Sequence, residues 1–543
     1  MTKHTVSKGP FEGQMPGTSG LRKKTRVFME PGYLECFVQS TFNAIGGAAG
    51  KTFVVGGDGR YFNAEAIQTI LKIAAANGAA RAIVGQGGIL STPAVSHLIR
   101  KQKTDGGLVL SASHNPGGID ADFGIKYNIS NGGPAPESVT AAIFEQTQTV
   151  HGYEISDAPD IDLNSVGQTQ IDEMTVDIDD PVADYAELME SLFDFDKIEA
   201  LFSDGFTMCF DAMHAVTGPY AKAILEDRLG APAGAVINAV PSEDFGGGHP
   251  DPNPVWAKTL MHRMMSTDAP DFGAASDGDG DRNMIVGRGT YVTPSDSLAV
   301  LAANAHVAPA YAKGLAGLAR SMPTSMAADR VADKLGIECF ETPTGWKFFG
   351  NLLDAGRVTL CGEESAGTGS EHVREKDGLW AVLLWLNILA VRKQSVAQIM
   401  QDHWAQFGRN YYSRHDYEAI PTAQADALMA GVQSQIATLE GTTWSGQRVL
   451  AADSFSYHDP VDGSVSHNQG LRITFDGGGR AVLRLSGTGT EGATLRVYLE
   501  QYVDETGNHT LTAEAALESV AAAVQEITAM QQHLGRIDPD VKT

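Results

Sequence analysis

Short β-rich runs that end in Gly-rich or charged loops recur along this sequence, and this pattern constrains the fold most strongly. Thr52–Val55 precedes the loop GGDGR and an Ala-rich helical stretch from Ala64 to Gly78. Further runs that end in such loops are Arg81–Val84, Leu108–Leu110, Phe272–Ala275, Arg357–Leu360 and Ala481–Leu485. Strands that alternate with helices predict an α/β fold. Open α/β sheets bind ligands beyond the carboxyl ends of their strands, so we expect the functional residues in these loops.

The length of the chain, 543 residues, is several times that of an ordinary domain, so we expect several domains with separate cores. An acidic, Pro-containing segment, Asp157–Asp184, precedes a helical pattern over Tyr185–Phe195 and indicates a first boundary near residue 190. Further boundaries are expected near residues 300 and 405, the second where the polar stretch QFGRNYYSRHDYE begins. The predicted domains are residues 1–190, 191–300, 301–405 and 406–543.

The net charge excludes some partners. The chain has 66 acidic residues against 40 Lys and Arg, a formal charge of −26. Such a surface repels nucleic-acid backbones and anionic membranes, so we expect neither as a partner. A small anion can still bind where Arg or Lys side chains converge with backbone N–H groups.

Cysteine spacing and hydropathy indicate a soluble protein of the cytoplasm. The four cysteines are scattered, at Cys36, Cys209, Cys339 and Cys361, and buried thiols in a reducing compartment explain them. The N-terminal residues lack the apolar stretch of a secretory signal. The run Leu379–Val391 is too short to span a bilayer and predicts a buried helix.

The loop SASHNPGG, Ser111–Gly118, carries a candidate nucleophile. The preceding strand leads Ser113 into a tight Pro-Gly turn, which is expected to expose its hydroxyl beside His114. A histidine there can donate a hydrogen bond or handle a proton. The loop lacks the two glycines of the G-x-S-x-G hydrolase motif. Taken alone, it is also compatible with a Ser-rich turn that only caps structure.

The loop SDGDGDR carries a candidate metal site. Asp277, Asp279 and Asp281 alternate with glycines and precede Arg282. Because carboxylates at this spacing repel one another, a hard divalent cation would stabilise them, and Mg²⁺ suits few protein oxygens. The twelfth residue counted from Asp277 is Arg288, not the Glu of an EF-hand. The alternative is an acidic turn without an ion.

Two later loops carry candidate substrate ligands. In CGEESAG, Glu363 and Ser365 could bind neighbouring sugar hydroxyls, and Lys376 follows in REKDG. In RLSGTGTEG, Arg484 stands before consecutive glycines and hydroxyl residues, and Arg496 follows on the next strand. Backbone N–H groups and arginines in this arrangement favour a phosphate site. The alternatives are a solvated polar loop and a plain Gly-rich turn.

Seven blocks of sequence, in this order, resemble the α-D-phosphohexomutase superfamily, and most of all its glucose-specific members. They are TSGLRKKT, SASHNPGG, DGDGDR, TGWKFF, CGEESAGTGS, REKDGLWAVL and RLSGTGTEGAT. The resemblance extends from about residue 10 to the C-terminus. It implies a heart-shaped, four-domain monomer, with three similar α/β domains and a smaller C-terminal α+β domain that binds phosphate. Each domain would give one loop to a central cleft.

The resemblance also implies roles for individual residues. Ser113 would carry the phosphoryl group, with its phosphate and Asp277, Asp279 and Asp281 holding one Mg²⁺ ion. Arg22, Lys126 and Arg282 would flank the transferring group, and Lys376 would carry a proton. Thr344, Gly345, Glu363 and Ser365 would grip the sugar. The distal phosphate would be held by Arg484, Ser486, Gly487, Thr488, Thr490 and Arg496.

The implied reaction interconverts glucose 1-phosphate and glucose 6-phosphate through glucose 1,6-bisphosphate, so sugar phosphates are the expected partners. Two alternatives are a mannose-preferring mutase and a catalytically silent binding protein. The sequence departs from its relatives at Ser111, where Thr is usual, and at Thr490-Glu491, where many have Ser-Ala. Glu491 would place a negative charge near the bound phosphate.

Overall fold

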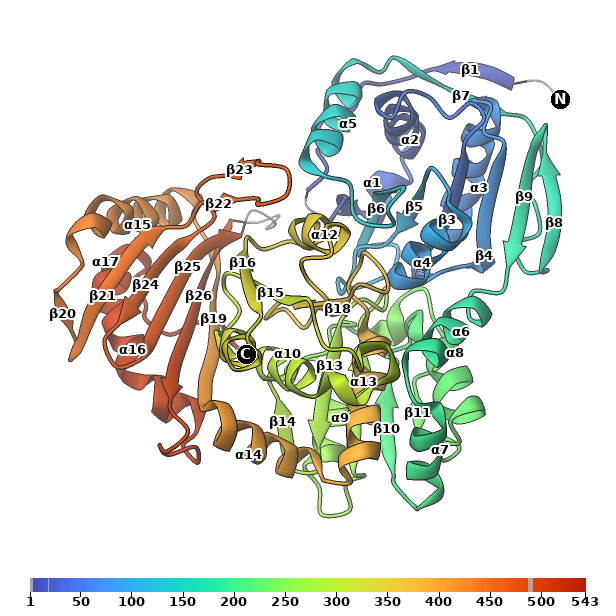
Figure 1. Ribbon diagram of the computed structural model, residues 1–543. Helices are drawn as coiled ribbons and strands as arrows, with labels where there is room; N and C mark the ends of the chain where they lie inside the picture. Colours follow the sequence, from blue (N-terminus) through green and yellow to red (C-terminus); the bar gives the residue numbers. More distant parts are fainter. Residues whose placement is uncertain (1–2, 18, 487–491) are drawn as a thin grey trace.

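The structure is a computed structural model that describes residues 3–17, 19–486 and 492–543. In these residues, three α/β units are followed by a C-terminal unit built on an antiparallel sheet. In Figure 1 the N-terminal unit (blue to teal) and the C-terminal sheet (orange to red) lie on opposite sides of the molecule. The middle of the chain lies between them. This architecture confirms the predicted fold class.

The N-terminal unit contains a seven-stranded sheet of order β2-β6-β5-β3-β4-β9-β8. Its central strands β5, β3, β4 and β9 are parallel. A small separate pair joins β1 to β7. The elements are β1 (Lys3–Ser7), β2 (Leu21–Lys24), α1 (Thr25–Phe28), α2 (Tyr33–Ala44), β3 (Thr52–Gly57), α3 (Asn63–Ala76), β4 (Arg81–Ile89), α4 (Thr92–Gln102), β5 (Gly106–Leu110), β6 (Asp122–Ile129), α5 (Glu137–Thr149), β7 (Gly152–Ser156), β8 (Gly167–Ile171) and β9 (Met174–Asp179).

The second unit has a five-stranded sheet of order β11-β10-β12-β13-β14. Its parallel strands are β11, β10 and β12, and β13 and β14 are antiparallel. The elements are α6 (Ala183–Leu192), α7 (Phe195–Ser203), β10 (Met208–Asp211), α8 (Thr217–Ala221) with a π-helical extension (Lys222–Arg228), β11 (Val236–Ile237), α9 (Lys258–Met264), β12 (Phe272–Ser276), β13 (Asn283–Gly287) and β14 (Thr290–Val292).

The third unit has a four-stranded sheet of order β16-β15-β17-β18. Strands β16, β15 and β17 are parallel, and β18 is antiparallel. The elements are α10 (Pro294–Asn304), β15 (Gly317–Ser321), α11 (Ala327–Leu335), β16 (Glu338–Thr342), α12 (Lys347–Asp354), β17 (Leu360–Gly362), β18 (Thr368–Ser370), α13 (Gly378–Arg392) and α14 (Val396–Phe407).

The C-terminal unit is built on a seven-stranded antiparallel sheet of order β20-β21-β24-β25-β26-β19-β27, and β22 and β23 form a separate antiparallel pair. Residues of α15 and α16 share an apolar core with this sheet, and Figure 1 shows α15, α16 and α17 grouped beside it. The elements are β19 (Arg409–Ile420), α15 (Thr422–Gln435), β20 (Thr443–Trp444), β21 (Gln447–Ser454), β22 (Tyr457–His458), β23 (Val465–Ser466), β24 (Leu471–Phe475), β25 (Gly479–Ser486), β26 (Ala493–Val503), α16 (Ala513–Ile527), α17 (Met530–Leu534) and β27 (Val541–Lys542).

The three α/β units place their functional loops at the same point of their topology. In each, a parallel strand ends, the loop follows, and the chain returns as an antiparallel neighbour: β5 to β6, β12 to β13, and β17 to β18. The sequence pattern predicted these strands but suggested helices after several of the loops. The prediction of a helix after the loop is confirmed for β3, which is followed by α3. It is wrong for the three loops named here, each of which is followed by a strand. The loops cover residues 111–121, 277–282 and 363–367, and paired strands hold both ends of each loop at the sheet edge.

Two predicted elements have different bounds. The helical pattern over Tyr185–Phe195 is divided between α6 and α7, because Asp194 caps the second helix by accepting from the Lys197 N–H at 3.2 Å. The strand predicted at Arg357–Leu360 begins only at Leu360. The N–H of Arg357 still donates to Leu352 at the end of α12, at 2.9 Å, so the chain cannot pair with the sheet before that turn ends.

The predicted buried helix is α13. Its residues Trp380 and Trp385 are fully buried in a core that also contains residues of all three α/β units. No single helix of the described residues is long and apolar enough to cross a membrane, although α13 and α14, bent by 86°, reach that length and composition together. Three of the cysteines are buried and Cys339 is half-buried, and all four are free thiols.

Candidate active site

Ser113 follows the end of β5. Its backbone N–H donates to Ser111 Oγ at 2.7 Å, and its carbonyl oxygen accepts from the buried guanidinium of Arg60 at 2.9 Å. Its φ of 53° lies in the left-handed region, which costs a non-glycine residue about 1 to 3 kcal/mol unless neighbouring contacts hold it there. The two hydrogen bonds supply such contacts and fix the direction of the side chain.

The Ser113 hydroxyl faces the loop between β12 and β13. Its Oγ donates to Asp277 Oδ2 at 3.1 Å and lies 3.3 Å from His114 Nδ1. The predicted exposure of this hydroxyl is wrong, since Ser113 is only 3% exposed. The reason is close packing: a Cβ at Gly278 would lie 2.5 Å from the Ser113 carbonyl oxygen. Burial and the nearby arginines lower the pKa of His114 well below its ordinary value.

The three predicted metal ligands lie together on the turn between β12 and β13. One carboxylate oxygen from each of Asp277, Asp279 and Asp281 lies within 4.8 Å of the others. All three residues are at most 3% exposed. Asp277 Oδ1 accepts from the N–H groups of Asp281 and Arg282, both at 3.0 Å, and the Thr92 hydroxyl donates to Asp279 Oδ2 at 2.8 Å.

Two carboxylate oxygens of this turn lack hydrogen-bond partners in the part of the chain that the structure describes. Asp279 Oδ1 and Asp281 Oδ1 are buried and have no hydrogen-bond partner among the described residues. Burial, with Asp279 and Asp281 close by, raises the pKa of Asp277 well above its ordinary value. Burial alone would raise the pKa of Asp279 too, but Lys126 and Lys376 lower it to about 2. Buried, unpartnered carboxylate oxygens at this spacing can hold a divalent metal ion.

The predicted cationic residues converge on the same turn. Lys376 Nζ lies 3.0 Å from Asp281 Oδ2, and Arg282 Nε lies 3.9 Å from Asp277 Oδ2. Burial would lower the pKa of Lys126, but Glu375, Asp279 and Asp281 raise it above its ordinary value. Burial lowers the pKa of Arg22, whose Nε has no hydrogen-bond partner among the described residues.

Glu375, in the REKDG segment, was not predicted to have a role. Glu375 is 1% exposed, and its Oε1 accepts from Lys126 Nζ at 3.1 Å and from Asn128 Nδ2 at 2.9 Å. It therefore holds a cation of the N-terminal unit from the third unit. Arg60, in the loop GGDGR, was likewise not predicted to have a role, although it donates to the Ser113 carbonyl oxygen. The available signal for Glu375 was its position directly before Lys376 in REKDG.

The sugar-binding candidates lie beside this centre. Glu363 Oε1 accepts from the Gly345 N–H at 2.9 Å, which joins the loop after β16 to the loop after β17. Burial raises the pKa of Glu363, while Lys376 and that N–H oppose the shift. Thr344 Oγ1 is buried and has no hydrogen-bond partner in the described parts of the chain. Ser365 lines the same cavity as Thr344, Gly345 and Glu363.

Backbone hydrogen bonds tie the loops of different units together. The Thr92 N–H donates to the Asp279 carbonyl at 2.9 Å, Asn283 to Ala366 at 3.0 Å, and Gly378 to Gly280 at 3.1 Å. These contacts fix the turn of residues 277–282, which we call the metal turn, between α4, the loop of residues 363–367, which we call the sugar loop, and the start of α13. The three aspartates are thus held in place by backbone as well as side-chain hydrogen bonds.

The C-terminal candidates lie on the antiparallel sheet. Arg484 on β25 pairs in register with Arg496 on β26, and Ser486 pairs with Thr494. Gly487, Thr488 and Thr490, together with Glu491, lie outside the described residues. The structure therefore brings the two predicted arginines side by side at the strand ends that flank this loop.

One cavity of about 150 Å³ joins residues of all four units. Arg496 of the C-terminal sheet lines it together with candidates of the three α/β units. Ser113, Asp277 and Arg484 do not line this cavity, and the first two lie buried beneath its wall. Its lining includes Ser19, Arg22, Lys126, Asp279, Asp281, Arg282, Thr344, Gly345, Glu363, Glu364, Ser365, Glu375 and Lys376.

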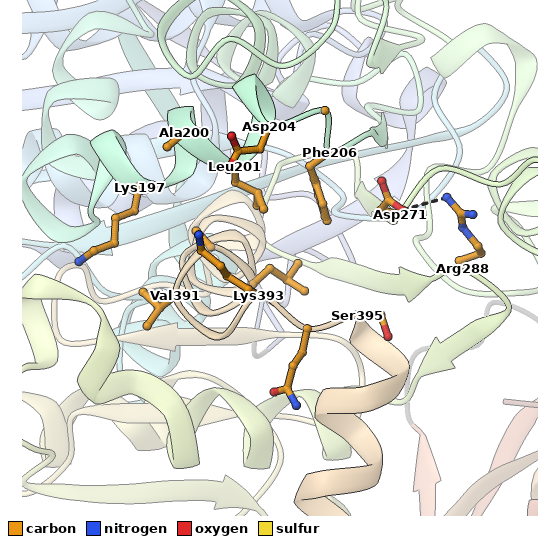
Figure 2. A pocket seen from close by; sticks show the side chains of 14 residues that line it. Lys197, Ala200, Leu201, Asp204, Phe206, Asp271, Arg288, Val391, Lys393 and Ser395 are labelled. Carbon is orange, nitrogen blue, oxygen red and sulfur yellow. Dashed lines mark hydrogen bonds and ion pairs between the residues drawn. The ribbon is translucent and has the colours of Figure 1, made fainter.

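A larger cavity, of about 930 Å³, lies elsewhere. Figure 2 shows it between α7 and the C-terminal end of α13, with Leu201 and Phe206 among its apolar side chains and the ion pair of Asp271 and Arg288 (2.8 Å) at one side. None of the predicted site residues lines it. We therefore assign the chemistry to the smaller cavity, where buried charges converge.

Comparison with known proteins gives the family. Sequence models of the phosphoglucomutase/phosphomannomutase α/β/α domains I, II and III match residues 13–154, 183–290 and 294–407. The model of the phosphoglucomutase-1 C-terminal domain matches residues 409–540. A phosphoglucomutase of Rhizobium radiobacter is 60% identical, over 99% of each chain. The chain belongs to the phosphoglucomutase family. It is accordingly an isomerase of the intramolecular phosphotransferase class.

Other phosphoglucomutases are also similar over most of their length. The cytoplasmic enzyme of Populus tremula is 50% identical over 99% of each chain. The crystal structure of pp63/parafusin, a phosphoglucomutase from Paramecium in its open form, is 47% identical with a TM-score of 0.93, and covers 100% of this chain and 99% of its own. Sugar phosphates are the substrates that this family implies.

Proposed function

We propose that this enzyme interconverts glucose 1-phosphate and glucose 6-phosphate through a phosphorylated Ser113. The observation that carries the proposal is the 3.1 Å contact of Ser113 Oγ with Asp277, inside the buried carboxylate group. Phosphoryl transfer depends on position and on neutralising the charge of the transferring group. A serine hydroxyl held against a cation site and surrounded by Arg and Lys meets both needs.

One Mg²⁺ ion is the proposed metal. Asp277, Asp279 and Asp281 would hold it, together with the phosphate on Ser113. Their unpartnered buried oxygens support this assignment, because Mg²⁺ prefers few carboxylates and keeps positions for phosphate oxygens. When bound, the ion supplies positive charge to the phosphoryl group in transfer.

In the first proposed half-reaction, the phosphoryl group leaves Ser113 for O6 of glucose 1-phosphate. The P–Oγ bond breaks, the P–O6 bond forms, and the O6 proton passes to Lys376, which accepts it as the neutral amine and then pairs as an ammonium with Asp281, 3.0 Å away. Arg22, Lys126 and Arg282 stabilise the charge on the phosphoryl oxygens. His114, 3.3 Å from Ser113 Oγ, keeps that oxygen in position.

In the second half-reaction, glucose 1,6-bisphosphate turns over within the cleft, so that the phosphate on O1 faces Ser113. The P–O1 bond breaks and the P–Oγ bond forms again, and Lys376 returns a proton to O1. The product is glucose 6-phosphate. Since the bisphosphate presents either end to Ser113, the other end needs a separate binding site.

The proposed substrate contacts lie on both sides of the cleft. Thr344, Gly345, Glu363 and Ser365 would bind the sugar hydroxyls. The phosphate remote from Ser113 would be bound by Arg484, Ser486, Gly487, Thr488, Thr490 and Arg496. The register pairing of Arg484 with Arg496 supports a shared anion site, since paired guanidinium groups can bind one phosphate through several hydrogen bonds.

A mannose-preferring mutase is the second candidate, because the matching domain models name phosphomannomutases as well. We favour glucose on the sequence Glu363-Glu364-Ser365. A coupled assay on glucose 1-phosphate and mannose 1-phosphate tests this choice. We expect a higher kcat/KM on glucose 1-phosphate; a higher value on mannose 1-phosphate would reverse the assignment.

We further propose a cytoplasmic monomer with domain boundaries near residues 190, 300 and 405. A mass of one chain in light scattering at micromolar concentration is expected, and a dimer mass would contradict it. Limited proteolysis with cleavage near those three positions would support the boundaries.

A further inference from the structure

One face of the C-terminal sheet presents charged residues toward the cleft. Strands β25, β26 and β19 are neighbours, and their register places Arg484, Arg496 and Asp416 in one row across the sheet. In the row two residues away, Arg414 of β19 lies opposite Tyr498. Alternate residues of a strand share a face. Arg414 and Asp416 therefore lie on the same face as the proposed phosphate-binding arginines.

Contacts join this face to the sugar loop. Arg414 NH1 donates to Glu364 Oε2 at 3.3 Å, and Arg414 Nε lies 3.1 Å from Asp416 Oδ1. Asp416 Oδ2 in turn lies 3.8 Å from Arg496 Nε. We call Glu364, Arg414, Asp416 and Arg496 the charge chain. Negative and positive side chains alternate along it, from Glu364 in the loop after β17 to Arg496 near the start of β26.

Burial makes the charge chain costly to break. The side chains of Glu364 and Asp416 are both 5% exposed, and that of Arg414 is 17% exposed. Burial alone would lower the pKa of Arg414, but Glu364 and Asp416 raise it. Without Arg414, the buried carboxylate of Glu364 would lose its ion-pair partner and Asp416 would keep only Arg496, at 3.8 Å, as a cationic partner among the described residues; leaving a buried charge unpaired is strongly destabilising.

Glu364 is also fixed through its backbone. Its N–H donates to Thr324 Oγ1 at 2.8 Å, and its neighbour Glu363 accepts from Gly345. Its carboxylate is the end that reaches the C-terminal sheet. The position of Glu364 is thus set by the third unit, while Arg414 connects it to the fourth.

We propose that Arg414 is a positioning residue for the mutase reaction, because it holds the sugar loop and the phosphate-binding arginine Arg496 at a fixed separation. This inference rests on the proposed function of Arg496. The substrate it serves is a hexose phosphate whose phosphate and hydroxyls must be bound at the same time. Fixing two binding groups before the substrate arrives reduces the cost of ordering them.

The first test is Arg414→Gln, assayed on glucose 1-phosphate with saturating glucose 1,6-bisphosphate. We expect KM to rise roughly three- to tenfold and kcat to change less, because Arg414 touches neither the substrate nor Ser113. Arg414→Lys keeps the charge but replaces the planar fork with one ammonium, so we expect a smaller rise, of about two- to fivefold. If Arg414→Gln does not fold, Arg414→Lys carries the test.

Tyr412→Phe is the matched control. Tyr412 lies on the same face of β19, and its hydroxyl donates to the Pro323 carbonyl of the third unit at 2.8 Å. The control removes a contact between the same two units but outside the charge chain. We expect its KM to stay within about twofold of wild type. An equal rise in KM for Tyr412→Phe would mean that general docking of the sheet, not the charge chain, sets the KM, and would overturn the proposal.

A double-mutant cycle with Arg496→Ala separates the remaining outcomes. A residue that fixes a separation matters only while both ends bind, so Arg414→Gln should raise KM by less than about twofold in the Arg496→Ala background. Effects that multiply fully, or an unchanged KM for Arg414→Gln alone, would overturn the positioning role. An unchanged KM for Arg496→Ala would instead refute the proposed phosphate site itself.

Discussion

The two ends of the site differ in how firmly they are built. At the reaction end, Ser113 and the three aspartates are at most 3% exposed, and backbone hydrogen bonds from Thr92 and Gly378 hold their loop. At the phosphate end, the Arg496 side chain is 32% exposed, and its ion pair with Asp416 spans 3.8 Å. Arg496 is thus more exposed to solvent than the groups at the reaction end.

This difference fits the two tasks. Charge that stabilises a transferring phosphoryl group acts best when it needs no reorganisation. A site that must accept the phosphate on O1 or on O6 in turn has to admit and release it. Substitutions at the reaction end should therefore lower kcat, and substitutions at the phosphate end should mainly raise KM.

The largest expected effect is that of Ser113→Ala. Loss of the nucleophile should reduce kcat below about a thousandth of the wild-type value. The change also removes the hydrogen bond to Asp277, so the free energy of unfolding should fall by only about 1 kcal/mol. Steady-state kinetics and thermal unfolding measure the two quantities. Ser111→Ala removes only the hydrogen bond that positions Ser113 and should retain more activity than Ser113→Ala; equal losses would contradict a special role for the Ser113 hydroxyl.

Asp279→Asn should have the next largest effect. It removes one charge and one carboxylate from the metal turn, and kcat should fall roughly 10²- to 10³-fold. Titration with Mg²⁺ should also show a weaker apparent affinity than in the wild type. Exhaustive EDTA treatment of the wild type should abolish turnover, and Mg²⁺ should restore it. Full activity after EDTA would exclude a role for the metal.

Arg496→Ala tests the phosphate end. It removes a charge-assisted contact of about 1.5 to 3 kcal/mol, so KM should rise on the order of tenfold to a hundredfold. Because the bisphosphate should also escape more often, turnover should need more added glucose 1,6-bisphosphate. Titration of the bisphosphate at fixed glucose 1-phosphate measures this need. If neither KM nor the requirement for glucose 1,6-bisphosphate changes, Arg496 does not bind the remote phosphate, and the proposed difference between the two ends is wrong.

Glu375→Gln should have the smallest effect of the four. The variant keeps an oxygen that can accept from Lys126 and Asn128 but loses the charge of the buried ion pair. We expect kcat to fall roughly tenfold with little change in KM, in contrast to Arg496→Ala. A rise in KM without a fall in kcat would place Glu375, and with it Lys126, among the substrate-binding groups.

The sequence predicted well several of the strands that lead into the functional loops. β3, β4, β5, β12 and β25 each begin within two residues of the predicted run, because their apolar residues are contiguous and turn residues follow them. The metal turn was recognisable because three aspartates within five residues are costly without an ion. The burial of Ser113 was not, since Gly278, which packs on it, lies far along the chain.

The charge chain could not be predicted from the sequence for a similar reason. Arg414 and Asp416 lie in the stretch QFGRNYYSRHDYE, whose polarity indicated a domain boundary. Most of this stretch lies in β19, between β26 and β27 of the C-terminal sheet. Its charged residues are stabilised by Glu364 and Arg496, which belong to other elements, and no local pattern reveals such pairing. The predicted boundary near residue 405 remains a prediction.

The most direct test of the account is to follow the phosphoryl group itself. The enzyme is incubated with glucose 1,6-bisphosphate carrying a radioactive phosphate, digested, and analysed by peptide mass spectrometry. We predict label on Ser113 that moves to the sugar phosphates within one turnover when unlabelled glucose 1-phosphate is added, and no label in Ser113→Ala. Label on another residue, or label on Ser113 that persists through many turnovers, would contradict phosphoryl transfer through Ser113.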